Sequence, residues 1–300
     1  MKSMEKTKVR VRTIPTKKES YLKDVLYRFS KHKLAMIGLV TIVLEILIVL
    51  LLPVILDADP YSLDLVSGFA AAPSSAHVLG TDEVGRDMLA RLLYGGRTSL
   101  RVGLLSAMIS LFIGVPIGLL AGYYKGILSG LMMRLSDVFM SVPAMILILV
   151  LVSVIGPSVR SVIIVIGVMG WPQFARQLYG SVLAVKEREY VEGARAVGVK
   201  NKDIMLKYVL PNAFAPVIIS FTFAIASAIL IESALSFLGM GVQPPMASWG
   251  NIMYAAQSIV IISQKPWMWV PPGIALLITV ISINFFGDGL RDALDPKTNV

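Results

Sequence analysis

Residues 34–56 read LAMIGLVTIVLEILIVLLLPVIL, an apolar run with one charged residue, Glu45. An α-helix needs about 20 mostly apolar residues to cross the hydrocarbon core of a bilayer, and this run is long enough. It is too long for the apolar region of a cleaved signal peptide, and the small-residue stretch 70–72 lies far downstream, directly before Pro73. We therefore predict a retained first transmembrane helix at residues 34–56, preceded by a basic cytoplasmic tail at residues 1–33.

The rest of the chain contains further apolar runs. The mean hydropathy is +0.74 and 56% of the residues are apolar, above the roughly 45–50% of soluble domains. The fourth of the six runs is shorter than a span unless its helix continues past Pro172. We predict an all-α, polytopic membrane helix bundle with six transmembrane helices, five of them in a core at residues 99–290. The five further runs are 102–123, 139–155, 162–171, 214–230 and 270–286.

The basic residues predict the orientation of this bundle. Cytoplasmic segments of membrane proteins carry an excess of Lys and Arg. With the amino terminus inside, only six of the 28 Lys and Arg residues lie outside, namely Arg86, Arg91, Arg97, Arg101, Arg160 and Lys265. We therefore predict that both termini are cytoplasmic, that residues 57–98 form an external loop, and that residues 291–300 form a cytoplasmic tail in a multi-pass protein of the cell membrane.

Composition also argues against several kinds of chemistry. The chain has no cysteine and two histidines, His32 and His77, which excludes disulfides and thiolate sites and argues against a histidine-ligated cofactor. The net charge of +9 reflects orientation, so it does not indicate a nucleic-acid partner. No Gly-x-x-x-x-Gly-Lys-Ser/Thr phosphate loop is present. We predict no catalytic site, no metal site and no bound cofactor, so the chain is not expected to be an enzyme.

A long polar segment at residues 172–212 separates the fourth and fifth apolar runs. Residues 186–196 have helix-forming composition with Arg188 and Glu192 four apart, and Gly198 is placed to end that helix. Residues 201–203 can start a second helix, which we expect to stop before Pro211. The segment therefore predicts two short cytoplasmic helices. Gly193 and Ala194 would leave room for another surface, although a solvated loop helix is an alternative interpretation.

The sequence Glu192-Gly193-Ala194, followed by Gly198 and then by Leu210-Pro211, resembles the EAA loop of binding-protein-dependent ABC importer permeases. Gly193 stands where that family usually has alanine, and Tyr208 where it often has isoleucine. In that family the loop fits a groove on the ATPase subunit. The resemblance implies that these six residues form an ATPase-coupling loop here.

Other motifs resemble the "C" type permeases of oligopeptide and dipeptide importers, within the peptide/opine/nickel class. Nearly everything after about Leu22 shares this resemblance. It implies a type I ABC importer permease fold and a translocation pathway for peptides, with relatives that carry nickel or oligosaccharides as alternatives. The motifs are GTDEVGRD (80–87), LSFLG (235–239), SWG (248–250) and GDGLRDALDP (287–296).

The same resemblance implies the partners. They would be a homologous "B" type permease, two ABC ATPases that bind ATP and Mg, and an extracytoplasmic substrate-binding protein. A self-contained secondary transporter is the alternative class, and it would usually show an inverted repeat, which we do not find. An intramembrane hydrolase is a third class, but it would need a convergent nucleophile and base.

A charge cluster in the predicted external loop comprises Asp82, Glu83, Arg86 and Asp87. Three carboxylates beside an arginine favour mutual pairing in an ordered turn that helps to seat a substrate-delivering partner. A metal site is a less favoured alternative.

Acidic residues within the apolar runs are further candidates, because charge at membrane depth is expensive and should face protein or a water-filled path. Glu232 lies beside Ser233 and Ser236, and we predict that these three residues line the translocation pathway. Asp137 could pair with Arg134, and Glu45 could face the partner permease. A structural hydrogen bond between helices is an equally open interpretation for each acid.

Overall fold

The computed structural model describes residues 21–64, 68–124 and 126–294, so most of the predicted basic tail and the last residues of the carboxyl tail lie outside it. The described residues form helices and no strand, with one isolated bridge between Thr81 and Asp87. The long helices are α1 (Tyr21–Lys31), α2 (Lys33–Ile55), α3 (Met88–Tyr123), α4 (Ile127–Ser141), α5 (Ala144–Ile155), α6 (Val159–Val185), α10 (Ala215–Phe237) and α13 (Val270–Leu294). The short ones are α7 (Glu189–Ala196), α8 (Asn201–Asp203), η1 (Ile204–Val209), α9 (Leu210–Ala213), α11 (Trp249–Met253), η2 (Tyr254–Gln257), α12 (Ile259–Gln264) and η3 (Pro266–Met268).

Four helices in the described chain, α2, α3, α10 and α13, are long and apolar enough to cross a membrane, and α4 with α5 could together make a fifth span. Helix α6 has 27 residues but is not one of the four. Its second half carries polar and charged residues, including Gln173 and Arg176. The predicted count of six spans and the orientation of the termini therefore stay predictions.

The third predicted run, 139–155, is not one continuous helix. Helices α4 and α5 meet at a break, and their axes differ by 87°. Pro143 lacks a backbone N–H and disfavours the helical conformation for the residue before it. Val142 is accordingly extended, with φ −97° and ψ 136°. The apolar composition could not show this bend, although Pro143 marks its position.

The fourth predicted run, 162–171, lies within α6, and this helix continues beyond Pro172 and ends at Val185. The polar segment that we expected to begin at residue 172 is therefore shorter, and it begins after Val185. Trp171, Pro172 and Phe174 are all buried. Packing against neighbouring helices offsets the backbone hydrogen bond that Pro172 cannot make.

Helix α3 packs along α6 through small residues that recur at every fourth position, which places them on one face of the helix. A Cβ atom at Gly114 would lie 2.6 Å from the Cβ of Phe174, and one at Gly122 would lie 2.8 Å from the Cβ of Val182. Such close approach of two backbones is typical of helix pairs in membranes. The stripe consists of Ser106, Ser110, Gly114, Gly118 and Gly122.

Helix α2 packs against α13 and α3 and contains Pro53. Proline has no N–H, so the carbonyl four residues earlier, that of Val49, loses its helical partner. The Nε of Arg97 on α3 donates to this carbonyl at 2.5 Å, and its Nη2 donates to the Leu50 carbonyl at 2.7 Å. The arginine thus satisfies a backbone acceptor that the proline has freed.

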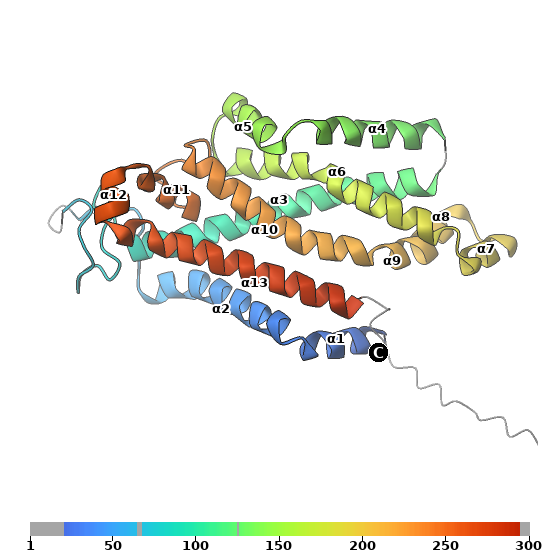
Figure 1. The fold of residues 1–300 in the computed structure, drawn as a ribbon, viewed down its shortest axis with the longest axis horizontal. Coiled ribbons are helices and arrows are strands. Elements are labelled where there is room, and N and C mark those ends of the chain that lie inside the picture. The colour runs from blue at the N-terminus through green and yellow to red at the C-terminus, as the bar shows by residue number, and fades with distance from the viewer. Residues whose placement is uncertain (1–20, 65–67, 125, 295–300) are drawn as a thin grey trace, which may run out of the picture.

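Helices α2, α3, α6, α10 and α13 run along the long axis of the molecule, whereas α5 is turned away from that direction (Figure 1). The segment before α3 lies at the same end as α11 and α12, and α7 with α8 lies at the opposite end. The predicted external and cytoplasmic segments are therefore at opposite ends of the helix bundle.

Candidate functional site

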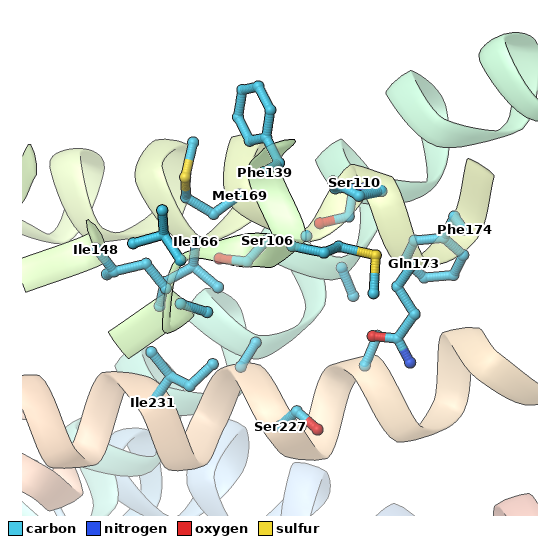
Figure 2. Close-up of a pocket in the computed structure, with 18 of the residues that line it drawn as sticks. Ser106, Ser110, Phe139, Ile148, Ile166, Met169, Gln173, Phe174, Ser227 and Ile231 are labelled. Carbon is cyan, nitrogen blue, oxygen red and sulfur yellow. The ribbon is translucent and has the colours of Figure 1, made fainter. Parts of the chain in front are cut away.

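A cavity of about 480 Å³ lies where the α4–α5 break faces α3, α6 and α10 (Figure 2). Its walls are mostly apolar, and Phe139, Ile148, Ile166 and Ile231 contribute to them. Within the described chain, no ionisable side chain lines it. The cavity therefore suits an uncharged, partly apolar ligand or segment.

The polar groups of the cavity are hydroxyls and one amide. Ser106 donates to the carbonyl of Ile163 at 3.2 Å, and Ser110 donates to that of Gly167 at 2.7 Å. Gln173 on α6 and Ser227 on α10 are exposed and line the cavity, and Gln173 projects toward α10 (Figure 2). A side-chain amide and a hydroxyl can each donate and accept hydrogen bonds, so these two can bind a ligand's amide groups.

The predicted pathway residues do not line this cavity. Glu232 is fully buried within the chain. It accepts hydrogen bonds from Ser99 on α3 at 3.0 Å and from Ser236 at 2.7 Å. Ser233 is also buried, and its hydroxyl has no partner among the described residues. The geometry is that of the alternative interpretation, a structural hydrogen bond between helices, and a role in transport stays a prediction.

The other two intramembrane acids also have partners within the chain. Glu45 accepts a hydrogen bond from Thr279 on α13 at 2.6 Å. Asp137 pairs with Arg176 on α6, whose Nη2 lies 2.6 Å from Oδ1. The expected pairing of Asp137 with Arg134 is therefore wrong, because the two helices that carry Asp137 and Arg176 pack side by side.

The predicted coupling loop begins as expected, with a short helix, α7, that ends at Ala196. Gly198 has φ +80°, the left-handed conformation that favours glycine after a helix. Gly193 is exposed, and a Cβ there would meet no atom within 4 Å. Ala194 is buried at 7% exposure against the chain's own core, which includes Ile204 and Val209. Only Gly193 of the predicted pair is therefore open to another surface.

The second half of the loop differs from the prediction. The helical path from α8 does not stop before Pro211 but continues through η1 and α9 to Ala213. The six residues of η1 form a π-helix, and the N–H of Leu210 donates to the carbonyl of Met205, five residues back. Pro211 follows directly at the second residue of α9, where the chain returns from the π-helix to the α-helix.

The expected support of Glu192 by Arg188 is also absent. No ion pair joins these two exposed residues, although both are within the described chain. Instead, the loop is attached to the end of α3. The buried Lys186 donates from Nζ to the carbonyl of Gly122 at 2.6 Å, and the Tyr123 hydroxyl donates to Oδ1 of Asn201 at 3.2 Å.

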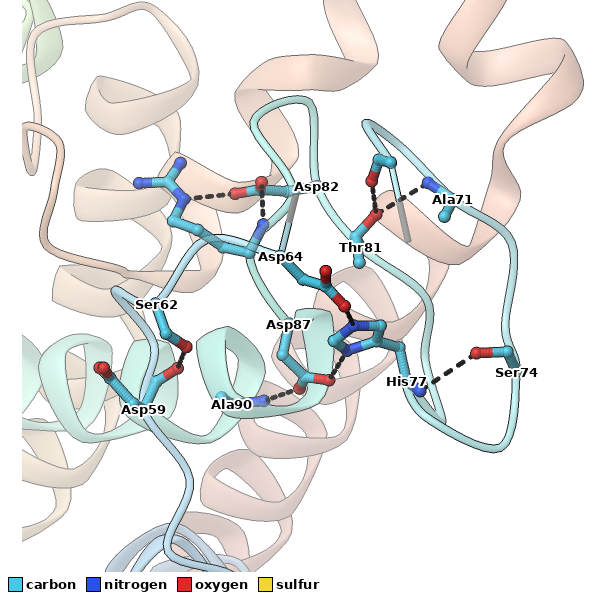
Figure 3. A network of polar contacts seen from close by, with 12 residues as sticks. Asp59, Ser62, Asp64, Ala71, Ser74, His77, Thr81, Asp82, Asp87 and Ala90 are labelled. Atoms are coloured by element: carbon cyan, nitrogen blue, oxygen red, sulfur yellow. Dashed lines mark hydrogen bonds and ion pairs between the residues drawn. The ribbon is translucent and has the colours of Figure 1, made fainter. Parts of the chain in front are cut away.

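The external charge cluster is a turn stabilised largely by Asp82 (Figure 3). Asp82 Oδ2 lies 2.7 Å from Arg86 Nε, and Oδ1 accepts from the backbone N–H groups of Val84 at 3.0 Å and Arg86 at 2.9 Å. The predicted mutual pairing is thus present for these two residues. Glu83 is exposed and has no ion-pair partner in the described segments.

Asp87 has a different role, as the N-cap of α3. It accepts from the backbone N–H of Ala90 at 2.7 Å and lies 2.7 Å from Nδ1 of His77, whose Nε2 lies 3.1 Å from Asp64 (Figure 3). The hydrogen bonds that the His77 ring donates to Asp87, and secondarily to Asp64, raise the pKa of His77. The part of His77 in this network was not predicted, although its place among several aspartates in the external loop was an available signal.

Comparison with known proteins decides the family. Residues 114–300 match the family described as the binding-protein-dependent transport system inner membrane component. The chain belongs to this family. Residues 20–73 also match the N-terminal TM domain of oligopeptide transport permease C.

Relatives of this inner membrane component match nearly the whole chain. This chain is 37% identical to the oligopeptide transport system permease protein OppC of Bacillus subtilis, over 95% of this chain and 92% of that protein. It is 38% identical to the di/tripeptide transport system permease protein DppC of Pseudomonas aeruginosa, over 93% of each. The dipeptide permease DppC of Alkalihalophilus pseudofirmus is 37% identical over 92% of this chain and 90% of that one.

The fold of the permease is also similar to that of a solved structure. A chain of the inward-facing MetNI methionine ABC transporter superposes with a TM-score of 0.58 at 21% identity, over 69% of this chain and 98% of that chain. The predicted all-α membrane bundle with an ABC importer permease fold is therefore confirmed, and so are the predicted family and the membrane location.

Proposed function

We propose that this permease forms, with a homologous "B" type permease, the pathway through which peptides enter the cell. The observation that carries the proposal is the 480 Å³ cavity, which combines apolar walls with Gln173 and Ser227 and lacks charge. A peptide backbone offers amide donors and acceptors whatever its side chains, so such a lining would pass many sequences. The relatives whose names specify peptides support the same substrate class.

The energy would come from other subunits. The chain has no phosphate loop, so we propose that two partner ATPases bind ATP and Mg and that an extracytoplasmic binding protein delivers the peptide. The face of α7 with Glu192 and Gly193, together with the turn at Gly198, is exposed and would contact an ATPase. Leu210 and Pro211 would support this loop from the following helix.

Two other cargoes remain as alternatives. Nickel would favour imidazole or carboxylate ligands along the pathway, and the described lining of the cavity holds no histidine and no acidic residue. An oligosaccharide would favour a lining richer in hydrogen-bonding groups than the mostly apolar walls here.

The test is ATP-dependent uptake of labelled di-, tri- and oligopeptides by the importer reconstituted in vesicles. Gln173→Leu should lower peptide uptake several-fold while all subunits still assemble, because a hydrogen-bonding group of the cavity is lost. Gln177→Leu, one turn away on α6 and outside this cavity, is the matched control and should transport normally. Uptake of nickel or oligosaccharide in place of peptides would overturn the proposed substrate class.

A further inference from the structure

A second pocket, of about 340 Å³, lies at the external end of the chain, separate from the 480 Å³ cavity. The turn at residues 82–86, the first turns of α3, the α11–η2 segment and η3 form its walls. We call it the external pocket. Nothing in the family comparison or in the proposed transport pathway explains it.

Arg91 on α3 lines the external pocket and is only 3% exposed. Its Nε lies 3.2 Å from Oδ2 of Asp82, and its Nη2 donates to Oδ1 of Asn251 at 3.1 Å. Its Nη1 is buried and has no hydrogen-bond partner among the described residues. A buried guanidinium donor without an acceptor is costly, so this atom points to a missing partner.

The carboxylates around the pocket leave Arg91 short of acceptors. Asp82 Oδ2 is shared between Arg86 and Arg91, and its Oδ1 is already used by backbone N–H groups. Glu83 also lines the pocket, but it is exposed and has no ion-pair partner within the described residues. The lining is formally neutral, so what Arg91 lacks is a hydrogen-bond acceptor, and an anionic oxygen is the strongest acceptor for a guanidinium.

The shape and chemistry of the pocket narrow the choice of anion. A planar guanidinium matches a planar carboxylate and can donate to it through more than one N–H group. Met88, Ile252 and Met268 give the pocket an apolar wall next to Arg91. The complementary ligand is a carboxylate attached to a small apolar body.

We infer that the external pocket binds the carboxylate of such a small apolar acid, and that the ligand it receives during import is the C-terminal residue of a peptide. The second half of this inference rests on the proposed function. Arg91 would contact the carboxylate, and the methionine and isoleucine side chains would contact the terminal side chain.

Direct binding to the permease complex in nanodiscs, without the external binding protein, tests the inference. The probe is N-acetyl-leucine, and N-acetyl-leucinamide is the same molecule without the carboxylate. We expect saturable binding of the acid and at least tenfold weaker binding of the amide. Equal binding of the two probes, or no binding of the acid, would overturn the inference.

Arg91→Met should weaken binding of the acid at least tenfold. Arg160→Met is the matched control, because Arg160 is an exposed arginine outside the external pocket. The Arg160→Met complex should bind the acid as tightly as the wild type does. Ala255→Phe keeps every charge but fills the pocket from its wall, so it tests the site even if Arg91→Met fails to assemble. Normal acid binding in either pocket variant would contradict the inference.

Peptide uptake by the complete importer separates this inference from the proposed function. Uptake of peptides by a wild-type complex that does not bind the acid overturns the inference alone. Acid binding without peptide uptake overturns the proposed function and the assignment of a peptide C-terminus as the ligand, but it leaves the carboxylate site itself intact.

Discussion

At the scale of single residues, several charged and small side chains are held by partners distant in the sequence. Asp137 on α4 pairs with Arg176 on α6 because these two helices pack side by side. Ala194 is buried because α7 packs against η1. In the external segment, His77 lies between Asp87 and Asp64.

His77 makes the external segment sensitive to pH. Its contacts with Asp87 and Asp64 raise its pKa, so they stabilise the folded segment fully below the unfolded-state pKa of about 6.5 and less as pH rises through the raised value. We expect hydrogen exchange of the amides at residues 77–90, corrected for its intrinsic pH dependence, to become faster above about pH 6.5. His77→Gln should abolish this change, and His32→Gln, at the junction of α1 and α2 at the opposite end of the helix bundle, should keep it. A His77→Gln profile like that of the wild type would show that the contacts do not stabilise the segment.

Gly193 and Ala194 are neighbours in the coupling loop but should respond differently to the same substitution. Ala194→Leu inserts volume into a packed core and should destabilise the loop by about 1–3 kcal/mol. Gly193→Leu adds a side chain in open space, so it should leave thermal stability unchanged and lower co-purification of the ATPases. Equal loss of stability in both variants would mean that the exposed face of α7 is not free.

At the scale of elements, the sequence predicted where helices exist better than where they break. The apolar runs at residues 34–56, 214–230 and 270–286 correspond to α2, α10 and α13, because long apolar runs have few alternatives in lipid. Prolines were misjudged in both directions. Pro172 and Pro211 lie within helical segments, whereas Pro143 stands at a sharp break. Tertiary packing decides whether a proline is tolerated within a helix or ends it, and the composition of the segment does not reveal that packing.

The contact between α3 and α6 should depend on the small residues of the stripe. In Gly118→Leu the new side chain would meet the backbone of Ala175, so we expect a large loss of thermal stability in nanodiscs and disruption of the 480 Å³ cavity. Gly130→Leu, on α4, is the matched control, since a Cβ there meets nothing within 4 Å. Similar melting temperatures for the two variants would argue against close α3–α6 packing in the membrane.

At the scale of the whole molecule, the fold places the external pocket and the coupling loop at opposite ends of the bundle. From the distribution of basic residues, the sequence predicted that the external loop and the coupling loop lie on opposite sides of the membrane. It could not predict the two pockets, because each is formed by segments far apart in the chain, such as Arg91 and Asn251.

Labelling of single cysteines tests the orientation of the bundle. The chain has no cysteine of its own, and Ser75 and Asn201 are both exposed. In intact cells, an impermeant thiol reagent should label Ser75→Cys and not Asn201→Cys, and permeabilised cells should label both. Thr298→Cys, at a position outside the described residues, should behave like Asn201→Cys. Labelling at residue 201 in intact cells would reverse the assigned orientation.

The bond from Arg97 to the carbonyl that Pro53 frees makes these two residues depend on each other's identity. With leucine at position 53, the helix would supply its own N–H to Val49, and the arginine would no longer be the donor that this carbonyl requires. With leucine at position 97 and proline retained, the Val49 carbonyl would be left without a donor. The loss of Arg97 is therefore harmful only while Pro53 is present. The order of change then matters, because α2 has to regain its own N–H before α3 can give up its arginine.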